Sequence, residues 1–381
     1  MKATREAAYS SVDTSPVAVY ISHPFWNQVV KLYPKWIAPN LLTFTGFLLV
    51  FISFALCSWL DWDLVASSSG HAGVPPLANW LWLFFALANF SAHVLDGTDG
   101  KQARRTGASG PTGELFDHGI DSWLTIPFTL LLFSIFGCED YGVNRYRLLL
   151  ILMSVQLVFI VSHWEKYNTG ILFLSWGYDV SQYMLSSLYL VTFFGGYAMW
   201  KYYAFGLLPP AVIIEITFYF ACFGMSIPMS LYNIHKGWKA GTLKQRSVYE
   251  ALLPLASTGL LFGLSAFWAG RRDLCELDFR SFAWLMGTIF SNIACRLIVA
   301  QMTATRCEAW NWLLCPLLAL AIPSCLGYLS PALEVQLIRL LAIGATLAHL
   351  HYGICVVRQM CDHLNIYCFS LAYLEQRKRK E

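Results

Sequence analysis

The sequence predicts an all-α polytopic membrane protein with about ten transmembrane helices. Of its 381 residues, 57% are hydrophobic and only 13% are charged, whereas about a quarter of the residues in a soluble domain are charged. The aromatic content of 16% is typical of bilayer proteins that place Trp and Tyr at both membrane interfaces. Apolar runs of roughly 20 residues, the length that a spanning helix requires, recur along the whole chain.

The segment before the first apolar run is predicted to lie on the membrane surface. Residues 22–40 read SHPFWNQVVKLYPKWIAPN and mix aromatic and aliphatic side chains with two lysines. This pattern predicts an interfacial amphipathic helix on the cytosolic leaflet, within a cytosolic N-terminal segment, 1–40. The alternative is an ordinary soluble N-terminal helix.

A membrane domain at 41–360 follows, with a basic cytosolic tail at 361–381. We expect its spans at 41–60, 78–96, 122–137, 147–163, 183–200, 207–234, 252–270, 282–303, 310–328 and 335–356. The sixth span contains Pro209, Pro210 and Pro228, which predict a tilt or a kink. Many transporter folds are built from internal repeats, and no such repeat is visible in this sequence.

The distribution of basic residues predicts the orientation. The N-terminal segment, alternate loops and the tail hold 18 of the 26 Lys and Arg residues, and the other loops hold 6. This bias places both termini and the loop at 97–121 in the cytosol. The net charge of +3 comes with no dense basic stripe, which argues against nucleic acid as a partner. Eleven cysteines occur without a CxxC pair, so neither a zinc site nor a disulfide framework is predicted.

Acidic residues gather around the end of the second span, in LDGTDGKQARRTGASGPTGELFDHGIDSW. Asp96 and Asp99 are three residues apart and share one face of a helix. After a loop rich in Gly, Ser and Pro (107–113), a second helix carries four residues on one stripe. These are Glu114, Asp117, His118 and Asp121. Two helix ends joined by a short turn would therefore point four aspartates into one pocket at the membrane surface.

Four neighbouring carboxylates require a counter-charge, because desolvation and mutual repulsion both oppose their ionisation. Hard oxygen ligands predict Mg²⁺, and two such ions would bridge a pyrophosphate. Glycines leave room for a substrate to approach the backbone, and Arg104 offers a fork of donors to a phosphate. These glycines are Gly97, Gly100 and Gly113. The alternative, that the aspartates are helix caps or solvated loop residues, does not explain four of them at helical spacing.

The same residues match a family signature. Asp-x-x-Asp-Gly-x-x-Ala-Arg, eight residues, and then Gly-x-x-x-Asp-x-x-x-Asp resembles the pattern of the CDP-alcohol phosphotransferases. Here it runs through Asp96, Asp99, Gly100, Ala103, Arg104, Gly113, Asp117 and Asp121 without departure. The resemblance implies that the first three aspartates bind two Mg²⁺ ions, for which Mn²⁺ can substitute, and that the fourth completes the site or lies nearby.

A wider resemblance covers roughly residues 10–370. SHPFWN, WIAPNLLTFTGFLLV, GELFDHGIDSW, SHWEKYNTGILFL and WGYD are similar to the eukaryotic ethanolaminephosphotransferases, the group that includes selenoprotein I. This implies a ten-helix fold with a cytosol-facing site. The sequence departs from selenoprotein I in ending with LEQRKRKE instead of a tail that bears selenocysteine.

The resemblance also implies roles for a Glu-x-x-x-His pair and an asparagine. His118 would be the general base and Glu114 would orient its ring. Asp121 is the rival base, and the alternative for His118 is a histidine that only lies between metal ligands. Asn40 resembles the asparagine that contacts the CDP-alcohol, and a helix N-cap is its other interpretation.

The expected reaction transfers phosphoethanolamine from CDP-ethanolamine to 1,2-diacylglycerol and yields phosphatidylethanolamine and CMP. Glu165 and Asp179 are candidates to accept from the ethanolamine ammonium group, with loop solvation as the alternative. A choline or dual choline/ethanolamine enzyme remains open. The alternative of a different class is a cation channel or transporter. It predicts acidic residues spread along several spans, whereas here they cluster at the end of one span and the start of the next.

Endoplasmic reticulum is the first expected membrane and Golgi the second. The sequence is compatible with a homodimer but does not determine the oligomeric state.

Overall fold

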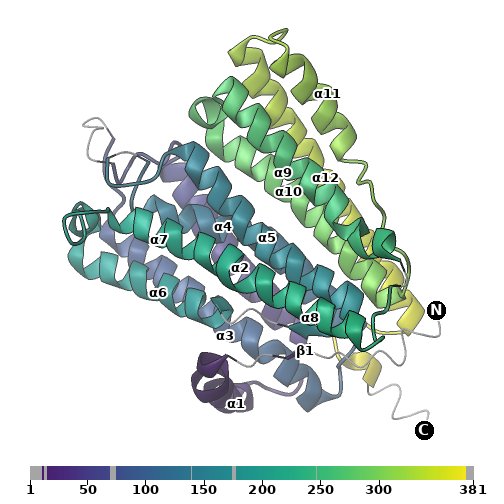
Figure 1. Ribbon diagram of the computed structural model, residues 1–381. Coiled ribbons are helices and arrows are strands. Elements are labelled where there is room, and N and C mark those ends of the chain that lie inside the picture. Colours follow the sequence, from purple (N-terminus) through teal and green to yellow (C-terminus); the bar gives the residue numbers. More distant parts are fainter. Residues whose placement is uncertain are drawn as a thin grey trace.

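Helices make up almost all of the regular structure in the computed structural model of the protein (Figure 1). The structure describes residues 11–12, 15–68, 74–138, 140–173, 177–245 and 247–374. The α-helices of these residues are α1 His23–Leu32, α2 Pro39–Leu60, α3 Asn79–Thr106, α4 Pro111–Ser134, α5 Arg145–Thr169, α6 Gly177–Gly195, α7 Pro210–Tyr219, α8 Ile227–Lys239, α9 Val248–Arg272, α10 Leu274–Thr303, α11 Leu314–Cys325 and α12 Pro331–Leu364. The prediction of an all-α fold is confirmed.

Several short elements accompany the helices. Two π-helical segments, η2 and η4, and one 3₁₀ segment, η3, occupy Ala18–Ser22, Phe220–Ser226 and Tyr197–Trp200. A parallel pair of two-residue strands joins β1, Ser11–Val12, to β2, Leu172–Phe173. This pair links the N-terminal segment to the stretch of chain that follows α5.

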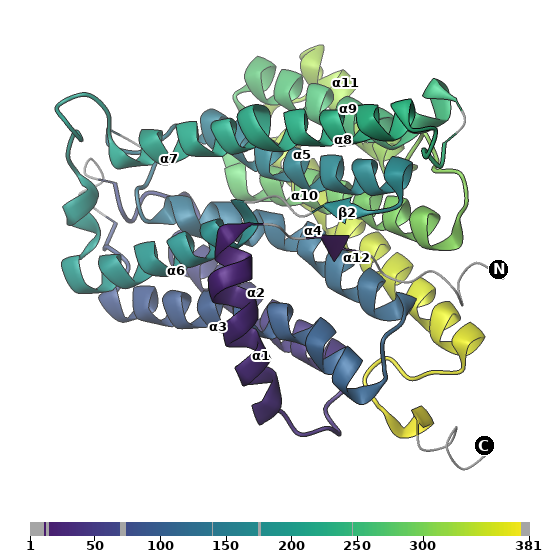
Figure 2. The same ribbon diagram turned by 60° about the horizontal axis from the view of Figure 1, so that its bottom comes forward.

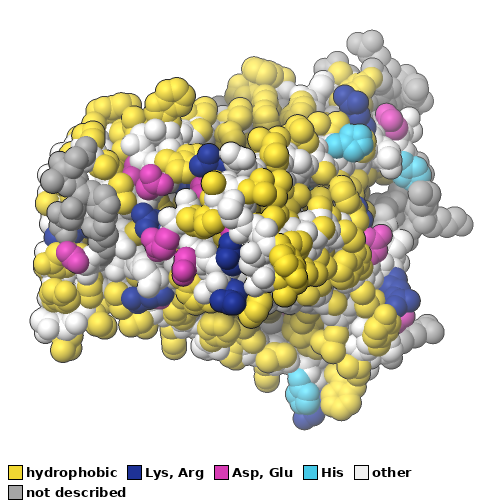
Figure 3. Space-filling view, turned by 90° about the horizontal axis from the view of Figure 1, so that it is seen from above, with side chains coloured by type: hydrophobic (Ala, Val, Ile, Leu, Met, Phe, Trp, Pro, Cys, Tyr) yellow, Lys and Arg dark blue, Asp and Glu magenta, His cyan; other side chains and the backbone are white. Residues whose placement is uncertain are grey.

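The polytopic character is supported by helix length and composition. Six helical stretches in the described part of the chain are long and apolar enough to cross a membrane: α2, α5, the run from α7 to α8, α9, α10 and α12. On the face in Figure 3, hydrophobic side chains cover most of the surface and charged side chains form small groups. We therefore describe the chain as a multi-pass membrane protein.

The predicted number of ten spans is not confirmed. The spans expected at 78–96, 122–137 and 183–200 fall in α3, α4 and α6, which do not join the six apolar helices. The span expected at 310–328 contains α11, which has only 12 residues. Twelve residues make about 18 Å of helix, which is less than the roughly 30 Å of a hydrocarbon core.

The prolines of the sixth predicted span do not interrupt its helix. Pro209 is the N-cap residue of α7 and Pro210 its first residue, and Pro228 lies in the first turn of α8. At the start of α7 the missing N–H of proline costs nothing, because that donor has no partner inside the helix. Pro228 instead lies inside the continuous helical run, directly after the π-helical segment η4. The helical run continues between them through η4.

The predicted N-terminal amphipathic helix is present but shorter than expected. Helix α1 ends at Leu32, because Tyr33 is extended before Pro34, as the residue before a proline prefers. Phe25 and Leu32 are exposed, whereas Trp26 is buried. Helix α1 crosses α3 on the outside of the helical assembly (Figure 2).

The helices that matter for the site are α2, α3, α4, α6 and α10, which pack on one another. Helices α2 and α3 approach closely at Gly46, where an added Cβ would lie 3.3 Å from the carbonyl oxygen of Ala92. Helices α4 and α10 are joined by buried polar contacts, including Ser122 to Ser291 at 2.6 Å. Helix α2 packs on both α3 and α4 and so links the two helices that carry the aspartates.

Candidate active site

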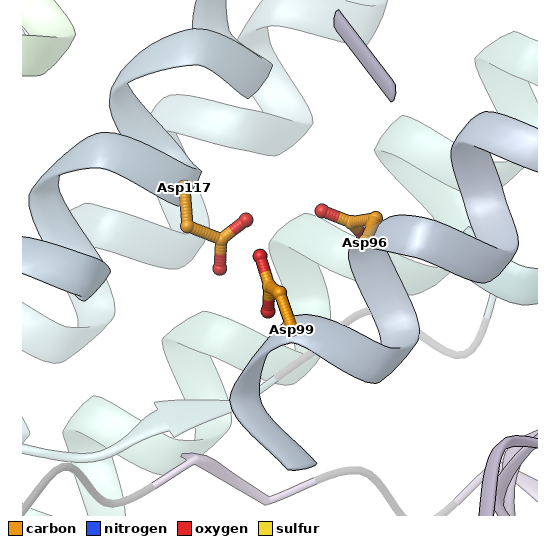
Figure 4. Close-up of side chains that lie close together, drawn as sticks. All are labelled: Asp96, Asp99 and Asp117. Carbon is orange, nitrogen blue, oxygen red and sulfur yellow. The ribbon is translucent and has the colours of Figure 1, made fainter. Parts of the chain in front are cut away.

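Three carboxylates meet between α3 and α4. Helix α3 ends at a left-handed Gly107, with φ of +75°, a conformation that glycine adopts without steric cost. Helix α4 then begins at Pro111. One oxygen from each of Asp96, Asp99 and Asp117 lies within 4.8 Å of the other two. Figure 4 shows the three side chains pointing toward one another.

Hydroxyl groups from two other helices hold the α3 carboxylates. Tyr178, in the first turn of α6, donates its hydroxyl to Asp96 Oδ2 at 2.9 Å. Thr43 of α2 donates to Asp99 Oδ2. Asp99 is buried, with 8% of its surface exposed. Four helices therefore contribute to this cluster.

The electrostatics of the cluster favour a bound cation. Burial, followed by the charge of Asp96, raises the pKa of Asp99 well above its usual range. Burial and then the charges of Asp99 and Asp96 do the same to the pKa of Asp117. Among the described residues, no salt bridge to Lys or Arg involves any of the three carboxylates. A divalent cation would remove this repulsion.

One buried oxygen of the cluster has no hydrogen-bond partner. Asp117 Oδ1 is enclosed and accepts no hydrogen bond from any described residue. A buried acceptor left unpaired costs about 1–3 kcal/mol, and a metal ion would satisfy it. The donor set of carboxylate oxygens is the type that Mg²⁺ and Mn²⁺ bind. The residues present therefore fit a divalent cation.

Asp121, the fourth predicted ligand, lies just outside this triplet. Its carboxyl is close enough to Asp96 and Asp99 for their charges to raise its pKa, although burial is the larger cause. Asp121 follows Asp117 by one turn of α4, as the spacing predicts. Its role as a ligand or as a base stays a prediction.

His118 is buried beside the carboxylates. Its ring makes an edge contact with the ring of His163 on α5, with centroids 5.2 Å apart. Burial lowers the pKa of His118 to about 4, against the opposing effect of Asp96. The imidazole is therefore neutral near pH 7, which is the form that can accept a proton.

Glu114 has a partner that the sequence did not indicate. Its carboxylate forms an ion pair with Lys166 of α5, and both side chains are largely buried, at 11% exposure. Glu114 also lies in the first turn of α4, where a negative charge is favourable. The predicted orientation of His118 by Glu114 stays a prediction, because the contact shown for Glu114 is the one to Lys166.

Asn40 lies close to Gly113, near the start of α4. It is the second residue of α2, whose N-cap is Ala38, so the N-cap interpretation of Asn40 is wrong. Its Oδ1 is 3.7 Å from the position of a Cβ added at Gly113. Gly113 and Asp117 are four residues apart and share one face of α4.

The other signature residues differ in how much space surrounds them. Gly100 is open, since an added Cβ would meet only Nη1 of Arg104, at 3.7 Å. Arg104 itself is exposed on the last turn of α3. Gly97 does not leave room for a substrate, because the ring of Trp26 from α1 fills that space at 2.3 Å from an added Cβ.

A family profile described as CDP-alcohol phosphatidyltransferase matches residues 36–208, which include all the signature residues. Ethanolaminephosphotransferase 1 of Homo sapiens is 48% identical over 366 residues, covering 95% of this chain and 91% of that protein. The chain belongs to the CDP-alcohol phosphatidyltransferase family.

Two further relatives are similar to this chain, to different extents. Ethanolaminephosphotransferase 1 of Mus musculus is 46% identical, again over 95% of this chain and 91% of that protein. Choline/ethanolaminephosphotransferase 1 of Saccharomyces cerevisiae is 32% identical over 72% of this chain and 76% of that protein. Membership makes the chain a transferase that uses divalent metal ions and acts on a CDP-alcohol and diacylglycerol.

The family signature does not contain several residues that the structure brings to the site. Thr43 and Tyr178 contact the carboxylates, Lys166 binds Glu114, and His163 lies against His118. Tyr178 belongs to the WGYD motif, in which only Asp179 had a predicted role. These four residues lie outside the signature at 96–121, so the spacing within the signature could not indicate them.

The two proposed partners of the substrate ammonium group contact other residues of the protein. Glu165 is buried and accepts hydrogen bonds from Ser230 at 2.6 Å and Asn233 at 2.7 Å. Asp179 is buried, with Oδ1 bonded to His93 at 3.0 Å and Oδ2 without a hydrogen-bond partner among the described residues. Neither is a solvated loop residue, and these contacts tie α5 to α8 and α6 to α3.

Proposed function

We propose that this protein is an ethanolaminephosphotransferase. It transfers phosphoethanolamine from CDP-ethanolamine to 1,2-diacylglycerol and releases phosphatidylethanolamine and CMP. The observation that carries the chemistry is the triplet of mutually close carboxylates, with its unpaired buried oxygen on Asp117. The choice of ethanolamine is supported by 46–48% identity to two proteins named ethanolaminephosphotransferase 1 across 95% of the chain.

Asp96, Asp99 and Asp117 would hold the divalent cations, with Asp121 beside them. Bound Mg²⁺ would neutralise the pyrophosphate and the charge that develops on the leaving phosphate. Tyr178 and Thr43 orient the carboxylates before the substrate arrives, so that little reorganisation is required during the reaction. Arg104, at the exposed end of α3, provides a fork of donors for a phosphate.

His118 is the proposed general base. A lipid hydroxyl must lose its proton as it attacks phosphorus, and the neutral buried imidazole can accept that proton. The attack forms a new phosphorus–oxygen bond and breaks the bond to the phosphate of CMP, which leaves with the electron pair. His163 packs against the imidazole, and Glu114 is held one turn away by Lys166.

The site would face the cytosol in the membrane of the endoplasmic reticulum, with the Golgi membrane as the alternative. The excess of Lys and Arg on one side of the membrane supports the orientation. CDP-ethanolamine would then enter from the water phase, and diacylglycerol would reach the same carboxylates from the bilayer.

The test is release of CMP by purified protein given CDP-ethanolamine and diacylglycerol, with Mg²⁺, with Mn²⁺ and with chelator. We expect turnover with either metal and none under full chelation. Turnover that survives chelation would contradict the metal role. A CDP-alcohol panel in the same assay compares the head groups.

The second candidate is a choline or dual choline/ethanolamine enzyme. The similarity to the yeast choline/ethanolaminephosphotransferase 1 favours it, although at the lower identity of 32%. Comparable kcat/KM for CDP-choline and CDP-ethanolamine in the panel would support this candidate over the first.

A further inference from the structure

The chain segment after α12 returns to the site and contacts Asn40. The side-chain amide of Asn40 donates to the backbone carbonyl of Cys368 at 3.0 Å. The same nitrogen lies 3.5 Å from Cys368 Sγ, a weak acceptor. Cys368 is 328 residues away along the chain, so the fold itself brings this partner to Asn40.

This contact fixes which way the Asn40 amide points. With the amide turned over, its oxygen would face the Cys368 carbonyl oxygen, and two acceptors would oppose each other. The nitrogen is therefore directed to Cys368, and Oδ1 is left directed to Gly113, on the face of α4 that also bears Asp117. Asn40 therefore offers its Oδ1 acceptor to the site, because its amide nitrogen donates to Cys368.

An aromatic cluster holds the segment in this place. The ring of Phe369 lies 5.7 Å from that of Phe44 on α2 and 5.4 Å from that of Phe116 on α4. Phe44 and Phe116 also contact each other, at 6.3 Å. Phe369 thus bridges the two helices that carry Asn40 and Asp117: Phe44 lies one turn after Asn40, and Phe116 directly precedes Asp117.

We propose that Cys368 and Phe369, here called the C-terminal pair, complete the CDP-alcohol site by fixing Asn40 as a hydrogen-bond acceptor for the nucleotide substrate. The group that Asn40 accepts from is an N–H or O–H donor of the substrate, such as an amino or hydroxyl group, and not a phosphate oxygen. Phe369 is a positioning residue, since it acts through Asn40. This inference rests on the proposed function of the site.

Phe369→Ala tests the pair through the Michaelis constants. We expect KM for CDP-ethanolamine to rise by about twofold to tenfold, because the segment loses its contacts with the rings of Phe44 and Phe116. The kcat value and KM for diacylglycerol stay near wild type. Phe369→Tyr keeps the ring and restores KM. Tyr367→Ala is the matched control, because Tyr367 is similarly exposed and its ring contacts Tyr373 at 6.4 Å.

A double-mutant cycle separates positioning from general damage to the fold. Because Phe369 acts through Asn40, Phe369→Ala should change KM little in a protein that already carries Asn40→Ala. The proposal is overturned if Phe369→Ala leaves KM for CDP-ethanolamine unchanged, or if it raises KM equally in both backgrounds. Failure of the proposed function would appear separately, as wild-type protein that releases no CMP from CDP-ethanolamine.

Discussion

Two groups of carboxylates lie at different heights along α10, and they differ in what neutralises them. One group is at the start of α10, and the other is the triplet of Asp96, Asp99 and Asp117. Near the start of α10, Asp278 accepts from Arg339 at 2.6 Å, and Glu334 of α12 accepts from Arg272 at 3.0 Å. Nearer the other end of α10, Cys295 packs on Gly119 of α4, which lies two residues after Asp117. Asp278 and Cys295 are 17 residues apart on α10, which is about 25 Å along the helix.

At the start of α10, donors within the chain satisfy the acids. Asp278 also accepts from the indole of Trp62, and Glu334 from the indole of Trp268. In the triplet, by contrast, three acids face one another, and Asp117 Oδ1 has no donor among the described residues. The mutual proximity of three carboxylates, none of them paired with Lys or Arg among the described residues, therefore distinguishes the triplet from the cation-paired acids at the start of α10.

The largest expected effect follows from removing one charge in the triplet. Asp117→Asn should lower turnover by about a thousandfold or more, because electrostatic stabilisation of the displacement is lost. Mg²⁺ should raise the thermal stability of the wild type but not that of the variant. CMP release and melting temperature with and without Mg²⁺ measure both effects. Substantial activity in a folded variant would remove Asp117 from the metal site.

Loss of the proposed base comes next. His118→Ala should reduce transfer by roughly a hundredfold to a thousandfold, the range for a general base. CDP-ethanolamine binding should persist, since His118 is not among the metal-binding carboxylates. Equilibrium binding of the nucleotide and single-turnover transfer distinguish the two. If nucleotide binding disappeared with transfer, the assignment of His118 as base would fail.

A smaller effect is expected from the hydroxyl that orients Asp96. Tyr178→Phe removes one hydrogen bond and keeps the ring, so kcat/KM should fall by about twofold to tenfold. Tyr183→Phe is the control, because Tyr183 bonds to Ser22 instead. Equal losses in the two variants would show that the Tyr178 contact is not specific to the carboxylate cluster.

The smallest effect on turnover is expected from the ion pair of Arg272 and Glu334 near the start of α10. Arg272→Met leaves Glu334 buried without its cation, which should cost about 3 kcal/mol of stability. Turnover per folded molecule should stay near wild type. Melting temperature and the specific activity of the monodisperse fraction test this. A loss of activity without a loss of stability would contradict the claim that the Arg272–Glu334 pair serves only the stability of the fold.

The sequence predicted the parts of the site that depend on local spacing. Asp96, Asp99 and Asp117 are brought together by helical periodicity and one short turn, which can be read from consecutive residues. Tyr178 and Lys166 come from other helices, and their contacts depend on packing that no local pattern encodes. The same holds for the return of Cys368 to Asn40.

The fold was predictable to a similar degree. Composition and apolar runs indicated an all-α membrane protein, and the structure agrees. The number of spans was not predictable, because apolar content does not fix helix length. The run at 310–328 contains only the 12 residues of α11, and Gly97, predicted to make room for substrate, instead accommodates the ring of Trp26.

The central claim is that the triplet holds divalent ions that also bind the substrate pyrophosphate. Titration with Mn²⁺, followed by electron paramagnetic resonance with and without CDP-ethanolamine, measures this directly. We predict about two bound Mn²⁺ ions per chain, magnetically coupled because such pairs lie about 3.5–4 Å apart, and loss of the coupled signal in Asp117→Asn. Wild-type protein that binds CDP-ethanolamine without binding Mn²⁺ would contradict the account.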